Sequence, residues 1–175
     1  MLESLITSQT RIRLLLKFFL NSSQTAYLRG LSTEFNESTN AIRLELNRFE
    51  KAGLISSTHE GNKKLFKANL RYPLFKDIHN ILLKHTGIDK IINDVVKKLG
   101  NVQRAWLTGD FAEGKDSQTI EIVLTGEHID TYYLQSLKDK AEKIIKKTII
   151  TKIISPAEEK EYLKTETPSL MIWED

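Results

Sequence analysis

The sequence predicts an α+β protein with two small domains, and three observations lead to this prediction. Apolar residues recur with helical spacing through the first half and are followed by one β-hairpin pattern. Strand and helix patterns alternate in the second half. Residues 1–88 hold 13 Lys and Arg against 7 Asp and Glu, a net charge of +6, whereas residues 89–175 hold 13 against 16, a net charge of −3. We therefore expect one domain over residues 1–86 and a second over residues 87–175.

The composition excludes several classes of protein. The 175 residues include no cysteine, so the chain has no disulfide framework, no thiolate metal site and no cysteine nucleophile. The apolar run at residues 14–20 is broken by Lys17 and is too short to cross a membrane. We expect a cytoplasmic protein that does not associate with membranes.

The pattern over residues 38–52 predicts an amphipathic helix. Ile42, Leu46 and Phe49 fall at i, i+4 and i+7, Ser38 is suited to cap the helix, and Gly53 is suited to end it. The opposite face carries short polar groups and one long cation near the N-terminal end, which is the end that a recognition helix presents to the major groove. The candidate DNA-reading residues are Ser38, Thr39, Asn40, Arg43 and Asn47.

Helices are expected before this one, and a hairpin after it. Residues 8–20 and 27–35 have helical patterns, and residues 36–37 form the turn that leads to the helix at 38–52. Residues 54–59 and 63–68 have strand patterns separated by a turn at 60–62. Cations on such a hairpin are placed to meet phosphates beside the groove that the helix occupies. The candidate phosphate-binding residues are Asn62, Lys63, Lys64 and Lys67.

Residues 28–31, 38–43 and 46–55 resemble the winged helix-turn-helix domain of bacterial ArsR-type transcriptional regulators. The most specific part is residues 49–55, where a helix end leads directly into the first wing strand. The resemblance implies a homodimer that binds double-stranded DNA, with the helix at 38–52 in the major groove and the wing on phosphates. Apolar stripes at residues 74–85 and 88–99 form either a dimer seam or the cover of the two domain cores.

The second half is expected to be a small α/β domain. Strand patterns occupy residues 103–108, 119–125, 148–154 and 170–173, and helix patterns occupy residues 131–147 and 156–163. Residues 105–114, 119–124 and 153–159 resemble a polymerase-beta-type nucleotidyltransferase domain. That resemblance implies a Gly-Ser pair that holds phosphates and acidic residues on neighbouring strands that hold Mg²⁺.

The residues at these positions depart from the nucleotidyltransferase pattern. Gly109 matches, but Asp110 stands in place of Ser, and Thr119 and Glu121 stand in place of the paired Asp. The strand at 148–154 contains no acidic residue. Without a metal-holding pair, nucleotidyl transfer loses its main electrostatic stabilisation. We expect a degenerate domain with no catalytic residues and no cofactor.

A metal site is also not expected. Asp77 and His79 have the spacing with which some ArsR-like zinc sensors begin a site, but Lys90 and Asn93 stand where a second His and a Glu would follow. The favoured function is a dimeric, non-enzymatic transcriptional regulator whose second domain binds an unknown effector, a partner or its own copy. The alternatives are a nucleotidyltransferase or antitoxin-like protein with the winged helix as a docking module, and a protein–protein module that does not bind DNA.

Overall fold

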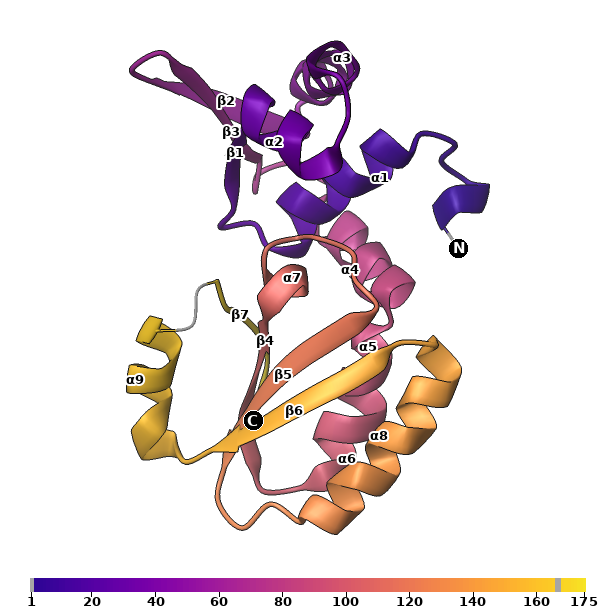
Figure 1. Ribbon diagram of the computed structural model, residues 1–175, viewed down its shortest axis with the longest axis vertical. Coiled ribbons are helices and arrows are strands. Elements are labelled where there is room, and N and C mark those ends of the chain that lie inside the picture. The colour runs from indigo at the N-terminus through magenta and orange to yellow at the C-terminus, as the bar shows by residue number, and fades with distance from the viewer. Residues whose placement is uncertain (1, 166–167) are drawn as a thin grey trace. The chain divides into compact units, whose positions relative to one another are not determined.

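The computed structural model describes residues 2–165 and 168–175 of the chain (Figure 1). The chain folds into two compact units, Met1–Leu82 and Leu83–Asp175, so the division falls inside helix α4 (Phe75–Thr86). Each unit contains helices and its own sheet, which confirms the α+β class. Within the described residues, no helix combines the length and the apolar character needed to span a membrane.

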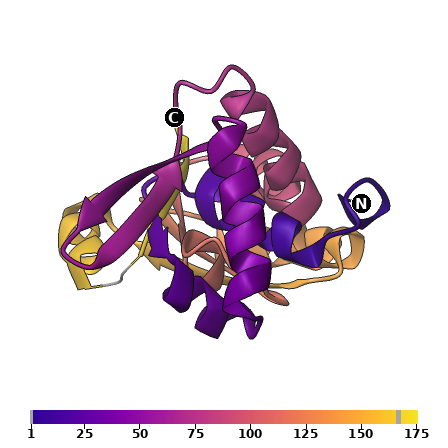
Figure 2. The same cartoon turned by 90° about the horizontal axis from the view of Figure 1, so that it is seen from above.

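The first unit contains a helix-turn-helix followed by a hairpin. Asn36, with a φ of 53°, adopts the left-handed conformation in the turn between the two helices of the pair. The hairpin strands join a third strand in an antiparallel sheet of order β1-β3-β2, and Figure 2 shows the hairpin extending beside α3. This is a winged-helix arrangement. Its elements are η1 (Leu2–Ser4), α1 (Gln9–Leu15), η2 (Leu16–Leu20), β1 (Thr25–Tyr27), α2 (Leu28–Phe35), α3 (Thr39–Lys51), β2 (Ile55–Glu60) and β3 (Lys63–Ala68).

The apolar stripe of α3 forms part of the first core, as predicted. Ile42, Leu46 and Phe49 are at most 3% exposed. The hydroxyl oxygen of Ser38 accepts a hydrogen bond from the backbone N–H of Ala41 at 3.2 Å, so the predicted cap is confirmed. Burying one stripe leaves the opposite face of α3 to solvent.

The second unit is a four-stranded sheet of order β6-β5-β4-β7. Strands β5 and β6 run parallel and are joined by α8, and the other two pairs are antiparallel. Helices α5 to α6 and α8 cover one face of the sheet, and α9 covers the other (Figure 1). Its elements after α4 are α5 (Ile88–Ile91), η3 (Ile92–Val96), α6 (Lys97–Leu99), β4 (Val102–Thr108), α7 (Gly109–Ala112), β5 (Thr119–Gly126), α8 (Thr131–Ile145), β6 (Thr148–Ile154), α9 (Pro156–Thr165) and β7 (Leu170–Glu174).

The helical stripe at residues 88–99 lies in the core of the second unit. Ile88, Ile91, Val95 and Val96 are at most 1% exposed, and their helix packs against α8 and β7. Of the two alternatives for this stripe, the single chain therefore supports the cover of a core rather than an open dimer seam.

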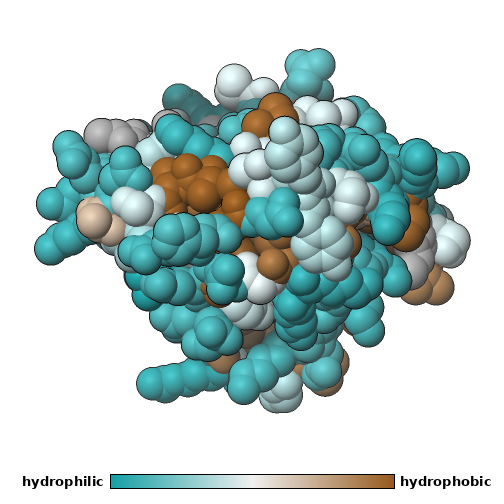
Figure 3. Space-filling view, turned by 90° about the horizontal axis from the view of Figure 1, so that it is seen from below, coloured by the Kyte–Doolittle hydropathy of each residue, from teal (hydrophilic) through white to brown (hydrophobic). Residues whose placement is uncertain are grey.

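Seen from below, the molecule has a mostly hydrophilic surface with a group of exposed hydrophobic side chains between hydrophilic ones (Figure 3).

Candidate nucleic-acid interface

The face of α3 that points away from the core is mainly polar, with the cation Arg43 near its N-terminal end, the cation Lys51 at its C-terminal end, and one apolar side chain. Thr39, Asn40, Arg43 and Asn47 are all exposed, as the helical periodicity predicted. Among the described residues, the guanidinium of Arg43 has no acidic partner. Leu44 shares this face and is 52% exposed, an unusual position for a large apolar residue.

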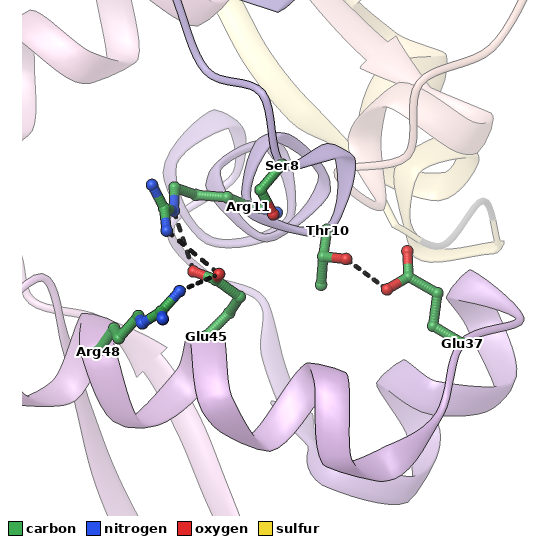
Figure 4. A network of polar contacts seen from close by, with 6 residues as sticks. All are labelled: Ser8, Thr10, Arg11, Glu37, Glu45 and Arg48. Carbon is green, nitrogen blue, oxygen red and sulfur yellow. Dashed lines mark hydrogen bonds and ion pairs between the residues drawn. The ribbon is translucent and has the colours of Figure 1, made fainter.

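An ion-pair network fixes α3 against α1. Figure 4 shows the carboxylate of Glu45, on α3, between the guanidinium groups of Arg11 and Arg48. Arg11 donates from Nε at 2.9 Å and from Nη2 at 3.1 Å, and Arg48 donates from Nη1 at 2.7 Å. Burial raises the pKa of the Glu45 carboxyl, but the two guanidinium groups outweigh burial and hold that pKa below its ordinary value. The negative charge of Glu45 is therefore balanced by Arg11 and Arg48.

Further contacts fix the turn between α2 and α3. The hydroxyl of Thr10 donates to the carboxylate of Glu37 (Figure 4), and Arg13 donates to the carbonyl oxygen of Phe35 at 2.8 Å. The hydroxyl of Ser32 donates to the backbone oxygen of Glu37 at 2.5 Å. These bonds come from α1 and α2 and meet at the turn before α3. They therefore fix the orientation in which α3 presents its exposed face.

The wing and the start of α2 enclose a basic groove. Its volume is about 530 Å³, and the exposed Arg29 lies on one side of it and the exposed Lys63 on the other. The ammonium of Lys63 lies 4.7 Å from the centre of the Tyr27 ring, which holds the cation over an aromatic face. The lining residues, called the wing groove below, are Tyr27, Leu28, Arg29, Asn62, Lys63 and Lys64.

Two of the predicted wing lysines differ from Lys63 in their surroundings. The ammonium of Lys64 lies 2.7 Å from a carboxylate oxygen of Glu50, so its charge is balanced within the protein. The side chain of Lys67 alternates with that of Phe66 and therefore points to the sheet face opposite the buried one. Lys67 pairs with Thr25 and Ser56 at the base of the wing, away from the turn at the tip.

Two residues that the sequence prediction did not include belong to this surface. Arg29 lines the wing groove because the short strand β1 brings the start of α2 beside the hairpin. Leu44 lies four residues after Asn40 and three before Asn47, so helical spacing alone could have placed it on the exposed face.

The degenerate positions of the second unit lie at the start of the inner strand β5 and at the end of its neighbour β4. Glu121 is paired with Thr108 on β4 and with Ile150 on β6, and Thr119 is two residues before it on the same face. A Cβ atom at Gly109 would lie 2.6 Å from a carboxylate oxygen of Glu121, so this acid packs against the glycine backbone. Asp110 is exposed. One carboxylate on strand β5 facing an isoleucine on β6 does not supply the paired oxygen ligands that Mg²⁺ requires.

His79, the histidine of the Asp77 spacing, has a structural contact. Its Nδ1 lies 2.8 Å from the backbone oxygen of Phe19, which places the proton on Nδ1, and its ring stacks with that of Phe75 at 6.4 Å. Across the part of the chain that the structure describes, no cluster of three or more His, Asp or Glu is arranged to hold a metal ion.

The chain matches no family model and no curated protein. Among solved structures, it is similar to reduced HlyU from Vibrio cholerae, with 16% identity, 47% of this chain and 82% of that chain covered, and a TM-score of 0.39. It is similar to Lactococcus lactis ZitR in complex with DNA, with 16% identity, 51% and 61% covered, and a TM-score of 0.36. It is also similar to a nucleotidyltransferase, described as putative, from Sulfolobus solfataricus, with 13% identity, 55% and 86% covered, and a TM-score of 0.37. Similarity this weak assigns neither a family nor a function to the chain.

Proposed function

We propose that this protein is a DNA-binding transcriptional regulator. One observation carries the proposal: the outer face of α3 presents the cation Arg43, which has no acidic partner among residues 2–165 and 168–175, while each acidic residue of that helix is balanced by a cation from within the protein. Glu45 is bound by Arg11 and Arg48, and Glu50 is bound by Lys64. A helix arranged in this way offers a polyanion no uncompensated carboxylate.

The side chains on α3 have the chemistry needed to read bases. A guanidinium binds the O6 and N7 acceptors of guanine, and carboxamides such as those of Asn40 and Asn47 bind the N6 and N7 atoms of adenine. An exposed apolar side chain such as Leu44 suits the methyl group of thymine. Phosphates would meet Lys63, Asn62 and Arg29 at the wing groove, which orients the helix without reading sequence. In a two-fold dimer, the two helices would read half-sites about one helical turn apart.

We infer that the second unit does not catalyse nucleotidyl transfer. The inference is supported by the single carboxylate of Glu121 and by the apolar Ile150 at the neighbouring position on β6. Phosphoryl chemistry needs metal ions to neutralise charge on the transferred group, and this face lacks the ligands to hold them. Isothermal titration of the protein with Mg²⁺ and each of the four nucleoside triphosphates is expected to show no heat of binding. Saturable binding that is lost in Glu121→Ala would contradict the inference.

The DNA-binding proposal is tested by fluorescence anisotropy. A preferred duplex is first selected from a random library, and its affinity is then compared with that of a scrambled duplex over a salt series. Arg43→Ala is expected to weaken binding to the selected duplex by about 1–3 kcal/mol and to reduce the preference for it. Lys63→Ala is expected to weaken binding to both duplexes equally and to make the salt slope shallower by about one unit.

Two matched lysine variants serve as controls. The double variant Lys64→Ala with Glu50→Ala removes a balanced ion pair and is expected to have a smaller effect on salt dependence than Lys63→Ala. Lys160→Ala removes an exposed cation from α9 in the other unit and is expected to leave affinity unchanged. Equal losses from Arg43→Ala on both duplexes would remove the claim of base reading. Absence of binding to any duplex would leave the winged helix as a protein-docking module.

A further inference from the structure

Strand β6 forms an open edge of the second sheet. The strand order β6-β5-β4-β7 places it at one end, and Figure 1 shows it beside β5 alone. Within residues 2–165 and 168–175, no strand pairs with its outer side. A row of unpaired backbone donors and acceptors is a template for pairing with another strand.

Two hydrogen bonds define which residues of β6 face this edge. The backbone N–H of Thr148 donates to the backbone oxygen of Gln118, the residue before β5, at 2.9 Å. The backbone N–H of Ile149 points the other way and donates to the carboxylate of Glu142, on α8, at 2.6 Å. Because backbone groups alternate along a parallel strand, the N–H and C=O groups of Thr151 and Ile153 also face outward. Glu142 therefore caps only the beginning of the edge.

The rest of the edge lacks the devices that usually prevent pairing. Strand β6 contains no proline and no acidic residue, and its register with β5 is continuous from Thr148 to Ile154. Its single cation, Lys152, has its ammonium 3.9 Å from the centre of the Tyr162 ring on α9, so this charge is drawn back over the sheet face. The opposite edge strand β7 differs, because it has an irregular register with β4 and carries Glu174.

Exposed apolar side chains accompany the open backbone groups. Ile150 is 53% exposed and Ile153 is 36% exposed on this edge strand. They lie on opposite faces of the sheet, because side chains alternate along a strand. A strand added to this edge would cover part of both.

We propose that β6 pairs with β6 of a second copy of this chain, antiparallel and centred on Thr151. This register joins outward-facing residues to outward-facing residues. Thr151 pairs with the partner's Thr151, and the carbonyl oxygen of Ile149 accepts from the N–H of the partner's Ile153, while the N–H of Ile149 stays on Glu142. It places Ile150 opposite the partner's Lys152, so the two lysines do not face each other. The strand is therefore complementary to itself in hydrogen bonding, charge and apolar contact. The pairing does not depend on the proposed DNA-binding function and creates one continuous sheet through two subunits.

A disulfide trap tests the register directly, because the natural chain has no cysteine. At the centre of the proposed pairing, the two Cα atoms of residue 151 would lie about 5.5 Å apart, a separation that a disulfide spans. Thr151→Cys is expected to form a covalent dimer under mild oxidation, on non-reducing gels. Ser136→Cys, on the exposed face of α8, is the matched control and is expected to stay monomeric under the same conditions.

Oligomeric state, measured by sedimentation equilibrium without DNA, provides the second test. The wild-type chain is expected at twice its mass of 20.1 kDa. Thr151→Pro removes an outward-facing N–H without breaking the bonds to β5 and is expected to raise the dimer dissociation constant more than about tenfold, whereas Thr151→Val retains the N–H and the dimer. Ile150→Lys is expected to weaken the dimer through repulsion from the partner's Lys152, and Ile150→Glu is expected to retain it.

Three results would overturn the proposal. A wild-type chain that is monomeric at all concentrations would show that the edge stays unpaired. A dimer that is unaffected by both Thr151→Pro and Ile150→Lys would place the interface elsewhere. Equal cross-linking of Thr151→Cys and Ser136→Cys would show that the disulfides form by random collision and not through the proposed register. Because DNA is absent from these measurements, their failure would leave the DNA-binding proposal to its own test.

Discussion

Replacing Glu45 with glutamine would test whether the Arg11–Glu45–Arg48 network stabilises the packing of helix α3. The substitution retains the shape of the side chain but removes the charge that two guanidinium groups share. A hydrogen bond to a charged group contributes about 1.5–3 kcal/mol. Arg11 and Arg48 are 38% and 62% exposed and can turn to water, which reduces the expected loss to about 1–2 kcal/mol at pH 7. For a unit of this size, we expect the melting temperature to fall by about 5–10 °C.

The pH dependence of this difference separates a charge effect from a packing effect. The pKa of Glu45 in the folded protein is below the ordinary value of 4.5, so the carboxylate contributes stability above that pH. The contribution is lost as the pH falls through the lower, folded pKa, because both proteins then carry a neutral side chain. Thermal unfolding of wild type and Glu45→Gln, followed by circular dichroism at pH 7 and in a series towards pH 3, should therefore converge. The control Glu161→Gln, at an exposed position on α9, is expected to change stability by less than about 0.5 kcal/mol. A pH-independent difference, or none at pH 7, would refute this account.

Three further substitutions test two buried contacts by urea unfolding. The side chain of Lys17 is 7% exposed, and its ammonium lies 3.0 Å from Glu34. Glu34→Ala is expected to destabilise by about 3 kcal/mol because it leaves a buried charge, whereas Lys17→Met is expected to stay within about 1 kcal/mol of wild type; the reverse order would contradict this. Gly87 has a φ of 88°, and a Cβ there would lie 2.9 Å from Ile145, so Gly87→Ala is expected to cost about 2–3 kcal/mol; an unchanged midpoint would be inconsistent with that crowding.

The local elements could be predicted from the sequence because their signals are local. The capping serine at position 38 and the apolar spacing after it predicted α3, and the structure confirms both. The strand pattern at residues 148–154 matches β6 at both ends. In these segments, propensity, periodicity and end signals all favour the same structure.

The short strand β1 (Thr25–Tyr27) could not be predicted in the same way. Residue 27 was expected to begin a helix, but β1 pairs with β3, which lies about forty residues later in the sequence. A strand of three residues carries too little alternation to be recognised, and it forms because a neighbouring strand offers hydrogen bonds. The inclusion of Arg29 in the wing groove follows from this pairing, so it could not be predicted either.

The charges of the candidate interface were only partly predictable. Counting residues gave the basic excess of the first unit correctly, but it treated Lys63, Lys64 and Lys67 as equivalent. The structure separates them, because the partner of Lys64 is Glu50, fourteen residues earlier on a different element. A pairing between elements depends on tertiary geometry, which periodicity does not encode. The base-reading and phosphate-binding roles of these residues stay predictions.

The contact between Glu50 and the hairpin has a consequence for the entropy of association. Glu50 accepts hydrogen bonds from Lys64 on β3 and from the hydroxyl of Ser57 on β2, and these bonds hold the pKa of its carboxyl below the ordinary value. The end of α3 is thus tied to both strands of the wing through one carboxylate. A protein that meets its target with two binding elements already in fixed orientation loses less conformational freedom on contact. The hairpin is already ordered relative to α3 in the folded protein. The free energy of a contact with a target therefore does not have to offset the cost of ordering the hairpin.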